Sequence, residues 1–158
     1  MKILYCDCYS GISGDMFLAA MLDAGYPLED LEKVFSLIEL PEYQKVSFRK
    51  VQKGAVSAGQ VTFVLREDPH HHTGDLIHGH SHRSFADIRK LITGSNLPES
   101  IVAKSLRIFE KIAQAESSVH NVPVDEVHFH EVGATDSILD IVGAAATLDY
   151  FGIDQIFS

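Results

Sequence analysis

The sequence predicts an α+β fold, a two-layer sandwich of helices on one face of a mostly antiparallel sheet, with a ferredoxin-like arrangement as one candidate. The predicted elements run β, α, α, β, β, then helices, then β, without the steady alternation of a doubly wound parallel sheet. In the strand-like run 60–67, Val61, Phe63 and Leu65 alternate with the intervening side chains. That period of two is typical of a strand with one buried face.

The first part of the chain predicts a strand, a turn and two helices. Residues Ile3–Cys8 form an apolar-rich strand that leads into the Gly/Ser turn at 10–15. The helix predicted over Met16–Ala24 is apolar nearly all round, so we expect it to be deeply buried. Gly25 ends this helix, and Pro27 starts a second, amphipathic one.

The remaining elements follow from strand alternation, helix caps and breakers. The Asp68-Pro69 pair ends the second central strand, and Ser84 with Asp87 supplies cap chemistry for the next helix. The predicted elements are strands at 44–52 and 60–67, helices at 84–93, 98–120 and 136–150, and a final strand at 153–157.

The composition favours one soluble domain of 158 residues. The 13 basic and 22 acidic residues give a net charge of −9, which argues against nucleic-acid binding. No apolar run is long enough for a membrane span, and no signal peptide opens the chain. Cys6 and Cys8 lie two apart on a strand, where a disulfide between them is unfavourable, so we expect reduced thiols and a cytoplasmic protein.

The segment HHHTGDLIHGHSH at 70–82 contains six of the nine histidines in the chain. Neutral imidazoles bind late transition metals, so a mobile, multi-site metal loop spanning 68–83 is one interpretation. A solvated low-complexity loop with incidental affinity is the other. The predicted metal ligands are His78, His80 and His82, with His70, His71 and His72 as a low-affinity group.

A second motif, EVHFHEVGATD at 126–136, contains an HxH pair. If 127–131 is extended, His128 and His130 point to the same face and are candidate metal ligands. The alternative is a histidine pair held by hydrogen bonds in the core. A barrel hydrolase built on HxH needs about 200–250 residues, so this chain is too short for one.

The helix before this motif contributes Glu116 and His120, which are i, i+4 neighbours within its apolar stripe. They either satisfy each other or join the HxH pair around an ion, and loss of Glu116 should cost about 1–3 kcal/mol. On the last helix, we expect Asp136 to be a cap or a charge of the first turn, and Asp140 to be solvated.

The segment DCYSGISGDM at 7–16 is a strand–turn–helix start with cap chemistry from Ser10 or Ser13. With Asp7 and Asp15 beside the turn, it is a candidate Mg²⁺–phosphate site, although it lacks the lysine of a P-loop. The alternative is a tight turn with a structural role only. Cys8 is a candidate reactive thiol or a small buried residue.

Together these segments resemble one family. DCYSGISGDM, the histidine-rich segment ending in His80-Ser81-His82-Arg83, and AESSVHNVPVDEVHFHEVGATDSILDIVG at 115–143 are similar to the LarC family of nickel-insertion proteins in nickel-pincer cofactor biosynthesis. The resemblance covers essentially the whole chain, and the long third motif is its most specific part.

The resemblance implies a CTP-dependent nickel chelatase of the lyase type. Such a protein inserts nickel into a pyridinium bis-thiocarboxylic acid mononucleotide, with one carbon–nickel and two sulfur–nickel bonds, to make the cofactor of lactate racemase. It also implies Mg or Mn with CTP, a C-terminal region that handles CTP, and a homo-oligomer. The chain is then a single N-terminal domain, 1–158, inactive alone. The alternative is a non-catalytic nickel-binding or storage module.

Overall fold

The computed structural model describes residues 1–66, 83–129 and 132–158 and confirms the α+β class. Each element predicted from the sequence is present there, with ends shifted by a few residues, and the short 3₁₀ turn η1 is an addition. The elements are β1 (Ile3–Tyr5), α1 (Gly14–Asp23), α2 (Leu28–Ser36), β2 (Tyr43–Lys53), β3 (Val56–Leu65), α3 (Phe85–Thr93), α4 (Glu99–His120), η1 (Val124–Glu126), α5 (Thr135–Phe151) and β4 (Gln155–Phe157).

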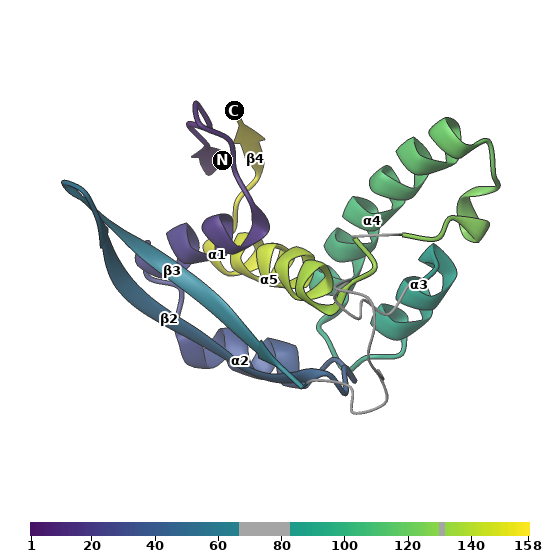
Figure 1. Cartoon of the computed structure of the whole chain (residues 1–158), viewed down its shortest axis with the longest axis horizontal. Coiled ribbons are helices and arrows are strands. Elements are labelled where there is room, and N and C mark those ends of the chain that lie inside the picture. The colour runs from purple at the N-terminus through teal and green to yellow at the C-terminus, as the bar shows by residue number, and fades with distance from the viewer. Residues whose placement is uncertain (67–82, 130–131) are drawn as a thin grey trace, which may run out of the picture.

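The strands form two separate two-stranded sheets in the described part of the chain, which corrects the expectation of one mostly antiparallel, ferredoxin-like sheet. β2 and β3 make a long antiparallel hairpin, whereas β1 and β4 pair in parallel. The β1–β4 pair projects away from the hairpin, with both chain ends on it (Figure 1). The sequence pattern identified the strands, but nothing in it specified that the first and last strands pair with each other.

The helix α5 lies at the centre of the molecule and contacts α1, α2 and α4 (Figure 1). Its fully buried residues include Ile138, Leu139 and Val142, which belong to one continuous apolar core. Phe35 from α2 lies in the same core and packs edge-to-face against Phe63 of the hairpin. Burial of each such side chain contributes about 1.5–3 kcal/mol, so α5 organises the fold.

One side of α1 is open, so the expectation of a helix buried all round is wrong. Leu18, Ala19, Met21 and Leu22 are buried, but Met16 is 55% exposed. The hairpin covers α1 only in part and leaves a pocket between them. No helix among the described residues is long and apolar enough to cross a lipid bilayer.

The β1–β4 pair is exposed on both faces. Tyr5 is 69% exposed, and Ile3, Ile156 and Phe157 are each at least half exposed. Parallel strands are usually covered on both faces, whereas this pair is open on both faces in the described part of the chain. Cys6 follows β1 as a free thiol, and burial together with the neighbouring Cys8 raises its pKa.

Candidate functional site

The HxH motif meets the start of α3 in a short antiparallel bridge between Ser84 and His128. The Phe129 N–H donates to the Arg83 carbonyl at 3.2 Å, and the Phe85 N–H donates to the Val127 carbonyl at 3.0 Å. Val127 and Phe129 are buried, whereas His128 is exposed. The alternation confirms the predicted extended backbone up to Phe129 and turns the His128 imidazole outward.

The aromatic ring of Phe129 anchors this bridge. It packs against Phe85 at 6.4 Å and Phe109 at 6.3 Å between ring centroids. The Ser84 hydroxyl and N–H both donate to the Asp87 carboxylate, which lowers the pKa of Asp87 and begins α3 with a capping box. The exposed His128 therefore lies on a rigid support next to an acidic side chain.

Arg83 links this bridge to two other elements. Its guanidinium donates to Glu42 Oε1 at 2.7 Å, to the Gly133 carbonyl at 3.1 Å and to Thr135 Oγ1 at 3.3 Å. The Glu42 carbonyl also accepts from the Arg66 N–H at 2.7 Å. Glu42 thus contacts Arg66 and Arg83, the described residues on either side of 67–82.

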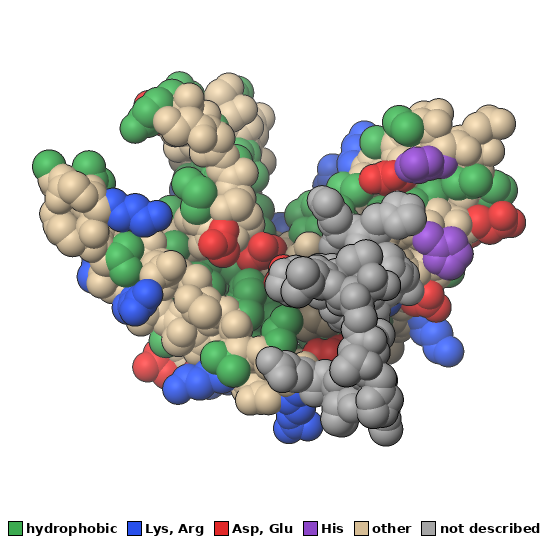
Figure 2. All heavy atoms as spheres, in the orientation of Figure 1, with side chains coloured by type: hydrophobic (Ala, Val, Ile, Leu, Met, Phe, Trp, Pro, Cys, Tyr) green, Lys and Arg blue, Asp and Glu red, His purple; other side chains and the backbone are tan. Residues whose placement is uncertain are grey.

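The predicted nickel ligands of the loop and one residue of the HxH pair lie outside the described residues. These are His70, His71, His72, His78, His80, His82 and His130. The described histidines are His120 and His128, and they form separate patches in Figure 2. Within the described ranges, no group of three His, Cys, Asp or Glu side chains is arranged to hold a metal ion.

Glu116 and His120 contact each other, as their spacing predicted, but on the surface. His120 Nε2 lies 3.1 Å from Glu116 Oε2, with side-chain exposures of 54% and 35%. The last turns of α4 extend beyond the core: burial stops at Ala113, and Val119 is 79% exposed. The expectation that Glu116 is buried in an apolar stripe is therefore wrong, and the described structure does not bring this pair to His128.

Asp140, expected to be solvated, is instead largely enclosed between α1 and α5. Burial, followed by the charges of Asp15 and Asp136, raises its pKa to about 7. Its Oδ1 atom is buried, without a hydrogen-bond partner among the described residues. Acidic side chains gather in the centre of the face shown in Figure 2. The i, i+4 spacing of the two α5 aspartates was the available sequence signal for this cluster.

The turn before α1 uses its own aspartate as the partner of its polar groups. Ser13 is the N-cap residue, but its hydroxyl donates to Asp15 and accepts no backbone N–H, contrary to the predicted cap. Asp15 also accepts from the Met16 N–H at 2.8 Å. Asp7 and Ser10 are exposed on the preceding segment. The turn is therefore acidic, and some of its hydrogen-bond donors already have an acceptor in Asp15. This arrangement is unfavourable for binding a phosphate and compatible with binding a cation.

The structure thus has an exposed imidazole, supported by packed aromatic side chains, and a cluster of carboxylate groups. Imidazole and carboxylate are donor groups that metal-handling proteins use. The family model described as nickel insertion protein matches residues 4–158, and the chain belongs to this family. The predicted resemblance is confirmed.

Proteins similar to the chain are also named as nickel insertion proteins. Proteins of Geobacillus kaustophilus and Acetivibrio thermocellus named pyridinium-3,5-bisthiocarboxylic acid mononucleotide nickel insertion protein are 44% and 41% identical to it, over the full chain. A Wolinella succinogenes protein, provisionally named a nickel insertion protein, is 46% identical. In each case the chain spans 38% of the relative's length. No solved structure matches the chain significantly.

Proposed function

We propose that this chain is the nickel-binding N-terminal part of an enzyme that inserts nickel into pyridinium-3,5-bisthiocarboxylic acid mononucleotide. The names of the two relatives at 44% and 41% identity support this substrate. Because the chain spans 38% of their length, the complete reaction belongs to the full-length protein. The full-length protein is then a chelatase of the lyase type, cytoplasmic and homo-oligomeric, whose product is the cofactor of lactate racemase.

The Ser84–His128 bridge is the observation that supports a nickel site best. Arg83 directly follows His82, and Phe129 directly precedes His130, while Arg83 and Phe129 share a backbone hydrogen bond. The described residues that adjoin the histidine-rich segment and His130 in the sequence are therefore hydrogen-bonded to each other. We propose that nickel is held there by imidazoles, which suit Ni²⁺. The proposed ligands are His78, His80, His82, His128 and His130.

The cluster of Asp15, Asp136 and Asp140 suits the second stage, in which nickel is bonded to carbon. When a ring C–H is replaced by C–Ni, the C–H bond breaks, its electron pair forms the bond to nickel, and the proton leaves. A carboxylate with a pKa of about 7 is matched to accepting that proton near neutral pH. We assign this role to Asp140.

Two further parts of the proposal concern the full-length protein. CTP and its Mg or Mn ion are bound by the C-terminal region, in accordance with the family resemblance. That region also covers the exposed β1–β4 pair, whose two apolar faces and open edges are otherwise unfavourable in water.

A double-mutant cycle tests the shared nickel site. His82→Ala and His128→Ala are made singly and together, and nickel affinity is measured by calorimetry. Ligands of one ion should be non-additive by at least about 0.5 kcal/mol. His120→Ala is the matched control because its partner is Glu116 on α4. Strict additivity of His82 and His128 would refute a shared site. The same substitutions in the full-length protein distinguish an enzyme from the alternative storage module. Loss of nickel insertion only at low nickel concentration would favour the enzyme.

A further inference from the structure

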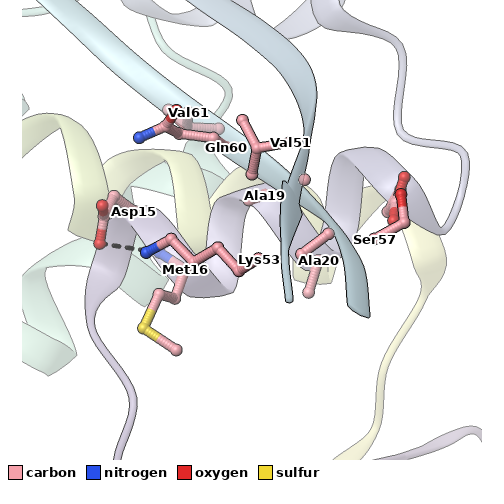
Figure 3. A pocket seen from close by; sticks show the side chains of 12 residues that line it. Asp15, Met16, Ala19, Ala20, Val51, Lys53, Ser57, Gln60 and Val61 are labelled. Carbon is pink, nitrogen blue, oxygen red and sulfur yellow. Dashed lines mark hydrogen bonds between the residues drawn. The ribbon is translucent and has the colours of Figure 1, made fainter. Parts of the chain in front are cut away.

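A pocket of about 440 Å³ lies between α1 and the β2–β3 hairpin, outside the histidine sites (Figure 3). This volume is within the range of about 300–1,000 Å³ that is usual for small-molecule sites. The lining residues come from three elements and include Asp15, Met16, Ala20, Lys53, Gly59 and Val61.

The walls of this pocket are mixed in character, and one part of them is made of small side chains. Ala19 and Ala20 of α1 face Ala58 and Gly59 of β3. A Cβ at Gly59 would lie 2.6 Å from the Phe48 ring and 3.0 Å from the Ala19 carbonyl, so only glycine permits this approach of strand and helix. The part of the pocket that is lined by Ala19, Ala20, Ala58 and Gly59 is called the slot below.

Opposite charges occur at the same pocket. Asp15 belongs to the first turn of α1, and Lys53 ends β2. The Lys53 side chain extends along the pocket toward Asp15 (Figure 3). Asp23, the other acidic residue of the lining, is paired with Lys50. A ligand that has both a cationic and an anionic group is therefore favoured over a purely apolar one.

We propose that this pocket binds the pyridinium ring of a mononucleotide, with the ring cation beside Asp15 and an acidic substituent beside Lys53. This inference rests on the proposed function, since it assigns the organic substrate of that reaction to a site. Asp15 also connects the pocket with the carboxylate cluster, because it borders the pocket and its charge raises the pKa of Asp140.

Nicotinic acid mononucleotide is a suitable probe because it combines a pyridinium ring, a ring carboxylate and a phosphate. Its affinity for the chain is measured by calorimetry. Ala20→Leu fills the slot, and Lys53→Met removes the ammonium group without shortening the side chain greatly. Each should weaken binding by about 10-fold or more. Ala103→Leu on α4 and Lys45→Met on β2 are matched controls, exposed and not part of the lining, and should bind as the unmodified chain does.

Nickel titration of the same samples separates this inference from the proposed function. Nickel affinity should be unchanged in Ala20→Leu and Lys53→Met, because neither residue is an imidazole ligand. The pocket assignment is overturned if the unmodified chain does not bind the probe at millimolar concentration, or if both variants bind it normally. A chain that binds the probe in the slot but binds no nickel would refute the proposed function and leave the pocket in place.

Discussion

Gly14, the first residue of α1, packs directly against the Asp140 carboxyl group of α5. A Cβ at position 14 would overlap the Asp140 side chain, so α1 approaches α5 this closely only because residue 14 is glycine. The contact removes water from Asp140 and holds Asp15, one residue further along, near it. Desolvation and the charge of Asp15 are the two largest reasons for the raised pKa of Asp140.

Gly14→Ala should therefore destabilise the protein, because the added methyl group has no space. Overpacking of this kind costs about 1–3 kcal/mol. The measurement is urea denaturation followed by circular dichroism. Ser13→Ala is the control on the same turn: the exposed Ser13 hydroxyl makes no backbone cap, and its loss should cost less than about 0.5 kcal/mol. Equal effects of the two substitutions would contradict the close packing.

Asp140 should make stability fall as the pH rises. Its folded-state pKa of about 7 lies above the ordinary value of 3.8, so between these values the folded state binds more protons than the unfolded state. The contribution of Asp140 to the free energy of unfolding is therefore fully present below about pH 4 and is lost as the pH rises through about 7. The facing charges of Asp15 and Asp136 act in the same direction.

Asp140→Asn removes this titration and should stabilise the chain more at pH 8 than at pH 5. Because the carboxyl group is largely but not completely enclosed, we expect the difference to be near 1 kcal/mol, or about 2–4 °C in melting temperature. Melting curves at the two pH values measure it. Asp154→Asn is the control, on an exposed aspartate beside the N-terminus. An equal gain at both pH values would show that Asp140 titrates normally.

Local pattern predicted the elements well, whereas contacts between distant elements were not predictable. Strand alternation and the Ser84–Asp87 cap located β3 and α3 because these signals lie within a few residues. The parallel pairing of β1 with β4 and the enclosure of Asp140 by Gly14 depend on packing between segments more than a hundred residues apart. Helical periodicity was correct for α4, but it does not reveal where the core ends along the helix.

Glu116→Ala illustrates that point, because its expected cost is now smaller than the apolar stripe suggested. On the last turns of α4, His120 is exposed and Glu116 is partly exposed. Exposed i, i+4 pairs contribute about 0.3–0.5 kcal/mol, so the loss should be of that order. Thermal melting against Glu110→Ala, an exposed glutamate of the same helix, measures the difference. A cost of about 1–3 kcal/mol would restore the earlier expectation of a buried carboxylate.

Replacement of residues 68–82 by a Gly/Ser linker should lower the number of nickel ions bound. Arg83 is kept, since its contacts with Glu42 and Thr135 are structural. Calorimetry at pH 7.5 counts the sites before and after replacement. A bound imidazole must be neutral, and free imidazole has a pKa of about 6.5, so nickel affinity should also weaken below that pH. Unchanged stoichiometry in the replaced chain would contradict a metal-binding role for the segment.

CTP should bind to this chain weakly and should not be turned over by it. The candidate phosphate turn has no lysine, and both the Ser13 hydroxyl and the Met16 N–H already donate to Asp15. A phosphate there would meet a carboxylate in place of free donors, which is unfavourable. Calorimetric titration of the chain with CTP and Mg²⁺ measures binding, with nickel as the positive control for folded protein. Micromolar CTP affinity that disappears in Asp15→Ala would place the nucleotide at this turn through a metal ion, and the division of roles proposed for the full-length protein would be wrong.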